Sequence, residues 1–157
     1  MKRSSAPATL VMVLATVFVP GILASARADD HRACSSVGLQ GSFGFTSVGT
    51  LLALPPGFNG PFGEIGRQTF DGRGNTDGTA TLSANGNIMK VAWVGSYVVS
   101  PDCTGSMTIT IAPFNTTATL DFVINDDGDE LRAIVTSTGA IETRVYRRQF
   151  TRGPKKD

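Results

Sequence analysis

The sequence predicts an all-β protein, a single antiparallel barrel of about eight strands with up-and-down connections. Two observations predict this class. Apolar and polar residues alternate with a period of two through most of residues 41–150, and no stretch of that region fits a helical repeat as well. Turn-forming Gly, Asn, Asp and Pro residues interrupt the alternation about every 8 to 12 residues. A barrel is preferred because closure removes exposed strand edges, and a two-sheet β-sandwich is the alternative.

The first 28 residues have the layout of a secretory signal peptide. Lys2 and Arg3 begin it, residues 9–19 are apolar apart from two threonines, and Ala26-Arg27-Ala28 provides the small residues of a cleavage site. We expect cleavage after Ala28 and an exported protein, periplasmic or extracellular. A retained membrane anchor is the alternative, but the apolar run is shorter than the roughly 20 residues that a spanning helix needs.

We expect no nucleic-acid partner, on the ground of charge, and no membrane association after signal cleavage, because no later segment is apolar enough to span a bilayer. Removal of residues 1–28 takes away three basic residues, so the net charge falls from +1 to about −2. Nucleic-acid binding requires a concentrated basic face. The basic cluster here lies at the end of the chain, and we expect residues 151–157 to form a disordered basic tail.

The remaining elements follow in order along the chain. Residues 29–40 are an N-terminal lead-in, and residues 41–150 form the barrel domain. A first strand over residues 41–54 ends at the loop 55–61, where prolines and glycines cannot continue a ladder. Further strands are expected at residues 62–70, 76–83, 88–100, 107–112, 116–124, 131–137 and 140–150.

Several connections carry residues that tight turns require. Asp71-Gly72 and Asn85-Gly86 favour the positive backbone angles of a hairpin. The acidic stretch 125–130 offers oxygen ligands for calcium, but its spacing fails the calcium-loop pattern. We therefore interpret this stretch as a turn and expect no metal site.

Cys34 and Cys103 are the only cysteines of the chain. An even pair in an exported protein predicts a disulfide, and a separation of 69 residues is far from a redox CxxC motif. The bond would fasten the lead-in to the turn "PDCTG". The only histidine, His31, lies next to the expected cleavage site, which disfavours a Ser-His-Asp or Cys-His catalytic arrangement. No cofactor is expected.

The barrel lumen is the remaining candidate site. Its polar groups are Glu64, Tyr97, Arg144 and Tyr146, of which Glu64 and Tyr97 are the candidate catalytic residues because a buried carboxyl or phenol can exchange protons. The alternative is that these side chains fill the barrel as its core. The sequence does not specify which face of the strands points inward. If it is the face of Trp93 and Tyr97, the candidate ligand-binding residues are Phe43, Phe45, Trp93, Tyr97, Met107 and Phe122.

The strings "FDGRGN", "GSYVVSPDCTGSMTI" and "YRRQF" carry a resemblance to a known group. Over residues 34–150 the chain resembles small exported bacterial proteins with a DCTG motif, and more loosely the calycin-like barrels of allene oxide cyclase and dirigent proteins. The resemblance implies a barrel that holds an apolar or aromatic intermediate. No catalytic motif of either family matches this chain residue by residue.

Three functions therefore stay open at the level of the sequence. The first is an exported barrel that binds a small apolar or aromatic ligand without catalysis. The second is a cyclase or isomerase that acts in the lumen, and the third is a structural or protein-binding module of the cell envelope. The sequence specifies neither the ligand nor the oligomeric state.

Overall fold

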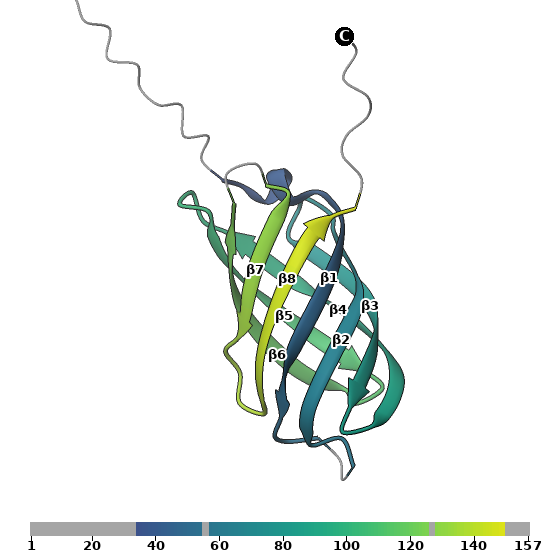
Figure 1. The fold of residues 1–157 in the computed structure, drawn as a ribbon. Helices are drawn as coiled ribbons and strands as arrows, with labels where there is room; N and C mark the ends of the chain where they lie inside the picture. Colours follow the sequence, from purple (N-terminus) through teal and green to yellow (C-terminus); the bar gives the residue numbers. More distant parts are fainter. Residues whose placement is uncertain (1–33, 55–56, 126–127, 150–157) are drawn as a thin grey trace, which may run out of the picture. The chain divides into compact units, whose positions relative to one another are not determined.

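The structure, a computed structural model, describes residues 34–54, 57–125 and 128–149. Within them eight antiparallel strands form a closed barrel, in which each strand pairs with its neighbours in sequence and β1 closes against β8 (Figure 1). The predicted up-and-down barrel is confirmed. Its strands are β1 (Gly41–Leu51), β2 (Gly60–Phe70), β3 (Asn75–Ala84), β4 (Asn87–Val99), β5 (Thr104–Ala112), β6 (Thr116–Ile124), β7 (Glu130–Val135) and β8 (Ala140–Arg148).

Several expected boundaries differ from the observed ones: β5 begins at Thr104, three residues before the expected start at Met107, and β7 ends at Val135, two residues before the expected end at Ser137. The first strand ends at Leu51, three residues before the expected end at Leu54. The lead-in contains a short 3-10 helix, η1 (Ser36–Leu39). The expected signal peptide, the first part of the lead-in and the expected tail lie outside the described residues. No helix in the described ranges is long and apolar enough to cross a membrane.

The alternation of the sequence produces the two faces of the barrel wall. In β3 buried and exposed positions alternate along nearly the whole strand, and the buried ones point into the lumen. The β3–β4 hairpin turns at Asn85 and Gly86, whose φ angles of 46° and 83° are the positive values that a two-residue hairpin requires. The predicted turn chemistry is thus confirmed at this position.

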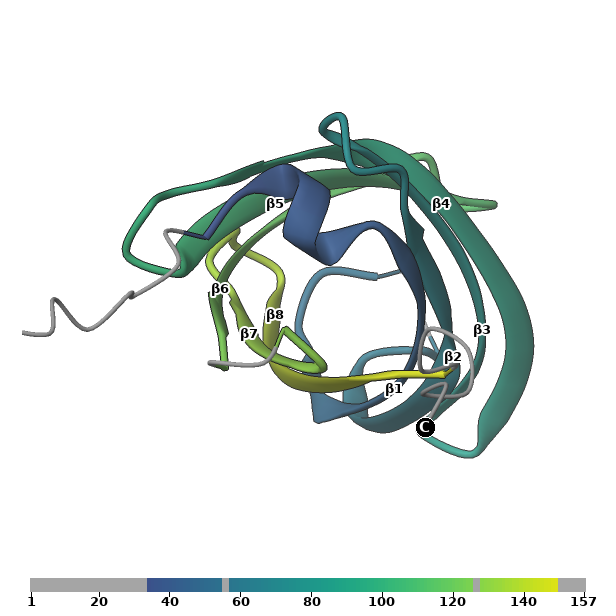
Figure 2. The same ribbon diagram turned by 90° about the horizontal axis from the view of Figure 1, so that it is seen from above.

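Successive hairpins place the connections at two opposite ends of the barrel. We call one the plugged end: it carries η1 and the turns after β2, β4 and β6. We call the other the open end: it carries the β1–β2 loop, the β3–β4 turn, the β5–β6 loop and the β7–β8 loop. Seen from the plugged end, η1 lies across part of the barrel opening (Figure 2).

The lead-in is fastened to the plugged end by covalent and polar contacts. Cys34 and Cys103 form the predicted disulfide. The side chain of Leu39 is buried, with 1% of its surface exposed. The guanidinium of Arg148 donates to the carbonyls of Gln40 and Gly38 at 2.8 and 2.9 Å. These contacts hold η1 against the ends of the strands.

The interior near this end is tightly packed. The ring of Phe70 contacts those of Phe43 and Tyr97 edge to face, with centroids 5.5 and 5.0 Å apart. Such geometry is the favourable one for aromatic pairs. Met107 and Leu120 complete this region and are almost entirely buried.

Candidate functional site

A cavity of about 290 Å³ occupies the lumen toward the open end. Its walls come from all eight strands, and its mouth comes from the β1–β2, β5–β6 and β7–β8 connections. Most of its walls are apolar, whereas three charged side chains line it together. The lining residues on the strands include Leu51, Phe62, Glu64, Leu82, Val91, Trp93, Ile111, Ala118, Glu142 and Arg144.

The charged cluster consists of Glu64, Glu142 and Arg144. The guanidinium Nη2 of Arg144 lies 3.5 Å from Oε2 of Glu64, and its Nε donates a hydrogen bond to Oε1 of Glu142. The hydroxyl of Ser47 donates to the same oxygen of Glu142 at 2.6 Å. Glu142 is therefore held by two donors, whereas Glu64 makes no hydrogen bond within the described residues.

Strand register explains why these side chains meet. Ser47 of β1 is the partner of both Glu64 on β2 and Arg144 on β8, so the three lie in one row across adjacent strands. Glu142 precedes Arg144 by two residues and so points to the same face of β8. All four residues are buried.

Burial controls the protonation of Glu64. It raises the pKa of this carboxyl from 4.5 to about 7, against the lowering effect of the Arg144 charge and with a further rise from Glu142. Removal of water penalises the charged form of a carboxyl more strongly than the neutral one. At neutral pH, Glu64 is therefore divided between its acidic and basic forms.

Two hydrogen-bond donors on cavity-lining residues have no partner within the described residues. They are Nη1 of Arg144 and Nε1 of Trp93. The Arg144 guanidinium lies over the rings of Phe45 and Trp93, 5.2 and 5.5 Å from their centroids. Buried polar atoms without a partner are uncommon in proteins and require an explanation, such as water or a ligand.

Gly78 permits the position of Trp93. The indole lies against the backbone of Gly78, its partner on β3, so that a Cβ at this position would overlap atoms of the ring, including Nε1. A glycine inside a strand often marks such a close approach. The sequence thus makes room for a large aromatic side chain beside the charged cluster.

Aromatic side chains also meet at the open end. Phe58 of the β1–β2 connection and Phe114 of the β5–β6 connection contact edge to face, with ring centroids 5.8 Å apart. Phe114 lines the cavity. The side-chain amide of Asn87 donates to the carbonyl of Gly57 at 2.7 Å and ties the first of these connections to β4. The two connections therefore contact one another next to the cavity.

The structure brings together only some of the residues that the sequence singled out. Glu64, Trp93 and Arg144 line the cavity. The ring of Phe45 contacts both Arg144 and Trp93. The other four predicted ligand-binding residues lie outside the cavity lining, in the packed core: Phe43, Tyr97, Met107 and Phe122.

The two predicted catalytic residues do not share a site. The hydroxyl of Tyr97 accepts a hydrogen bond from the backbone N–H of Gly72 at 3.0 Å and donates to the carbonyl of Ser36 at 3.2 Å. These partners belong to the plugged end, whereas Glu64 lines the cavity toward the open end. Tyr97 thus connects β4 with the lead-in.

Glu142 and Ser47 are the members of the site that the sequence analysis missed. A signal for Glu142 was present, because Glu142, Arg144 and Tyr146 alternate on one face of the last strand. No comparable pattern distinguishes Ser47 from the other hydroxyl residues of the chain.

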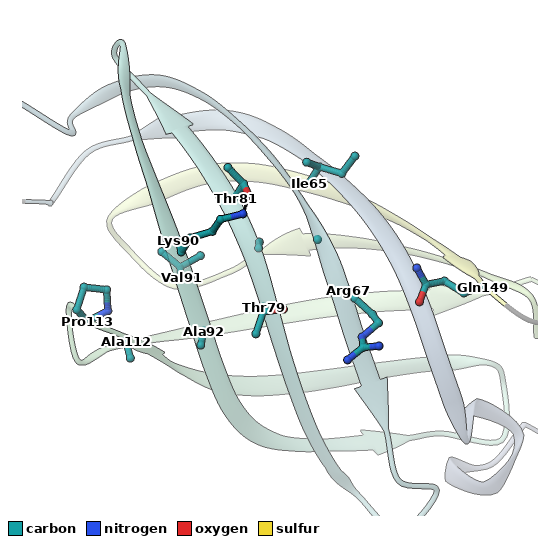
Figure 3. A pocket seen from close by; sticks show the side chains of 12 residues that line it. Ile65, Arg67, Thr79, Thr81, Lys90, Val91, Ala92, Ala112, Pro113 and Gln149 are labelled. Atoms are coloured by element: carbon teal, nitrogen blue, oxygen red, sulfur yellow. Dashed lines mark hydrogen bonds between the residues drawn. The ribbon is translucent and has the colours of Figure 1, made fainter.

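A second depression lies on the outer wall of β2, β3 and β4 (Figure 3). A shallow groove lies there, between exposed side chains that include Ile65, Arg67 and Lys90. The ammonium of Lys90 donates to Thr81 at 2.7 Å. An open groove without a buried polar group is a weaker small-molecule site than the lumen cavity.

The described part of the chain contains no group of three His, Cys, Asp or Glu side chains that could hold a metal ion. Comparison of the chain with protein-family models, with curated proteins and with solved structures gave no match. The resemblance to DCTG proteins and to the cyclase and dirigent barrels stays a prediction.

Proposed function

We propose that this protein is an exported barrel that binds a small, largely apolar molecule in its lumen. The observation that carries the proposal is the cavity of about 290 Å³, which joins apolar walls to a few buried polar groups. Small-molecule sites are generally built in this way. A lumen filled by side chains would have argued against binding.

The cavity also limits the size of the ligand. One water occupies about 30 Å³ of liquid, so the space corresponds to roughly ten non-hydrogen atoms. This lies at the lower end of the volumes found for ligand pockets, about 300 to 1,000 Å³. The expected ligand is therefore a compact ring or a short branched chain.

The disulfide supports an oxidising compartment outside the cytoplasm, because such bonds rarely persist in a reducing one. Export and a periplasmic or extracellular location are part of the proposal. They rest on the N-terminal pattern of residues 1–28.

Native mass spectrometry of the protein purified from its own host tests ligand binding. The expected result is a mass increment that is released by mild activation. The variant Ala118→Leu, at a cavity-lining position, should lose this increment because the added side chain occupies the space. The control Ala92→Leu, at an exposed position on the outer face of β4, should retain it. Absence of any increment, or equal retention in both variants, would contradict the proposal.

A second candidate function is proton transfer by Glu64, as in an isomerase or cyclase. The supporting observation is a cavity-lining carboxyl with a pKa of about 7, raised by burial. As a base, Glu64 would remove a proton from a carbon next to a carbonyl, leaving the electron pair in an enolate. As an acid, it would return that proton to a carbon, so no oxidant or reductant is needed.

Hydrogen exchange of a small ketone tests this second function. The protein should accelerate exchange of the α-protons of 1-indanone in D₂O, followed by NMR. Glu64→Gln should reduce the accelerated rate by about a hundredfold or more, since general bases typically contribute that much. Equal rates with the wild type and the variant would exclude Glu64 as the base.

A further inference from the structure

Glu64 offers unused hydrogen-bonding capacity to the lumen cavity. Its side chain lines the cavity, keeps 5% of its surface accessible and makes no hydrogen bond within the described residues. Oε2 of Glu142, which lines the same cavity, also makes none there. Nε1 of Trp93 and Nη1 of Arg144, in contrast, are fully buried and do not open onto the cavity. An ionised carboxyl only accepts hydrogen bonds, so a complementary ligand must present N–H or O–H donors.

The formal charges of the cluster do not balance when Glu64 is ionised. Glu64 and Glu142 are then two carboxylates beside the single guanidinium of Arg144, which lies 3.5 Å from the first and donates to the second. The remaining lining residues are uncharged, and so are the register partners of Glu64, Ser47 on β1 and Leu82 on β3. An unbalanced charge in a water-poor site is costly. One cation placed beside Glu64 would balance it.

The depth of Glu64 determines how a ligand would lie. β2 begins at the open end, and Phe62 is the inward-facing position between that end and Glu64. Phe62 lines the cavity together with Leu51 and Ile111, which lie near the open ends of β1 and β5. A molecule that enters from the open end therefore meets apolar side chains near the mouth and the carboxyl at greater depth.

We infer that the lumen ligand is a small alkylammonium compound, with one protonated primary amine beside Glu64 and an apolar body toward the open end. The inference rests on the proposed binding function and names its ligand class. A primary ammonium provides three donors and the missing positive charge. An alcohol provides one donor and leaves the charge unbalanced. A carboxylate would add a third negative charge beside Glu64 and Glu142, which is costly in a water-poor site.

Four compounds with one ring separate these classes: cyclohexylmethylamine, cyclohexylmethanol, ethylcyclohexane and cyclohexanecarboxylate. All of them fit within the roughly ten non-hydrogen atoms that the cavity holds. The titrations are made at about pH 8, where Glu64 is mostly ionised. The fluorescence of Trp93, the only tryptophan, should change on binding because its indole lines the cavity. We expect the amine to bind at least about tenfold more tightly than each of the other three.

The outcomes separate failure of the inference from failure of the proposed function. Binding of the alcohol or the hydrocarbon as tight as that of the amine, or preference for the carboxylate, would overturn the inference and leave the binding function standing. If none of the four compounds binds, by fluorescence or by calorimetry, both the proposed function and the inference are contradicted.

A matched pair of substitutions tests whether the charge of Glu64 is the one that acts. Glu64→Gln keeps the size of the side chain and removes its charge, so it should weaken the amine by at least about tenfold and change the affinity for cyclohexylmethanol by no more than about twofold. Asp121→Asn removes the same charge on the outer face of β6, where Asp121 is exposed, and should leave both affinities unchanged. Unchanged amine affinity in Glu64→Gln, or equal weakening by the two substitutions, would contradict the inference.

The amine and a proton compete for the Glu64 carboxyl. Burial raises the pKa of this carboxyl to about 7, whereas an alkylamine, like lysine, has a pKa of roughly 10.4 and stays charged. In the wild type the affinity for cyclohexylmethylamine should therefore rise about tenfold between roughly pH 6 and pH 8, and in Glu64→Gln it should stay constant. A fall over this range would mean that the protonated carboxyl is the bound form, and a rise that persists in the variant would assign the effect to another group. Either result would overturn the pairing with Glu64.

Discussion

The two ends of this barrel are built from the same eight strands but hold their interiors in different ways. At the plugged end, the Tyr97 hydroxyl and the Arg148 guanidinium have several partners each. Toward the open end, Glu64 has no hydrogen bond within the described residues, and Arg144 and Trp93 each keep an unpartnered donor. Among the described residues, two further buried side-chain atoms lack a well-formed hydrogen bond, Oε1 of Gln68 and the hydroxyl of Tyr146, which interacts with Arg144; both lie in the packed interior.

This difference indicates that the plugged end stabilises the fold, whereas the open end holds the candidate site. Unpaired buried polar groups cost free energy, so they persist only where the rest of the fold is stable enough to carry them. The disulfide and the aromatic packing supply stability at the end that has no cavity. Unpartnered atoms occur in both regions, but only those of Trp93 and Arg144 belong to residues that line the cavity.

Removal of the disulfide should be among the largest effects. Cys34→Ser combined with Cys103→Ser opens a link between residues separated by 69 positions. The free energy of unfolding should fall by about 4 kcal/mol on the chain-entropy model, as measured by guanidinium denaturation. The wild type in reductant is the control and should behave like the variant. A loss below about 1 kcal/mol would show that the plugged end does not depend on this bond.

A matched pair of leucines compares the two regions directly. Leu120 is entirely buried in the packed interior, whereas Leu82 lines the cavity. Leu120→Ala should cost about 4 kcal/mol, because it opens a new void in a packed region. Leu82→Ala should cost about 2 kcal/mol, because it enlarges a space that already exists. Equal losses in thermal and chemical unfolding would mean that the two regions are packed alike.

The sequence was sufficient for the barrel because the fold depends on local features. The period of two identifies the strands and divides each into two faces, and turns such as Asn85-Gly86 set where strands reverse. The partnership of Cys34 and Cys103 followed from there being only two cysteines. Each of these features can be recognised without knowing how distant strands are aligned.

The site depends on such alignment and was predicted only in part. Alternation placed Trp93 and Tyr97 on one face of their strand, but it could not show that this face points inward or that Tyr97 lies at the plugged end. That position follows from its contact with Ser36, 61 residues earlier in the chain. Likewise, a cavity is the small difference between the volume of the lumen and that of its side chains, which sequence patterns do not determine.

The pH dependence of stability should reveal the free-energy cost of burying the Glu64 carboxylate near the open end. In the unfolded chain Glu64 ionises near 4.5, and in the folded protein near 7, because burial disfavours its charge. The folded state therefore holds the extra proton between these values, and stability falls as the pH rises through them, by up to roughly 3 kcal/mol.

Glu64→Gln isolates this contribution. The variant cannot ionise, so its advantage over the wild type should grow from about pH 4.5 to pH 7 and then become constant. Urea denaturation of both proteins at several pH values measures the difference. A difference that does not vary with pH would show that the pKa of Glu64 is the same in the folded and unfolded states and that its burial carries no such cost.

The two tyrosines allow the comparison with the smallest expected effects, because a Tyr→Phe substitution removes only the hydroxyl. Tyr97→Phe removes the hydrogen bonds to Gly72 and Ser36 and should cost about 1 kcal/mol. Tyr146→Phe removes a buried hydroxyl that makes no well-formed hydrogen bond within the described residues but interacts with the Arg144 guanidinium, so it should cost less than Tyr97→Phe. Tyr97→Phe should not alter ligand affinity, since Tyr97 does not line the cavity. If Tyr97→Phe weakens binding of cyclohexylmethylamine without loss of stability, the hydroxyl belongs to the site and the separation of the two ends is wrong.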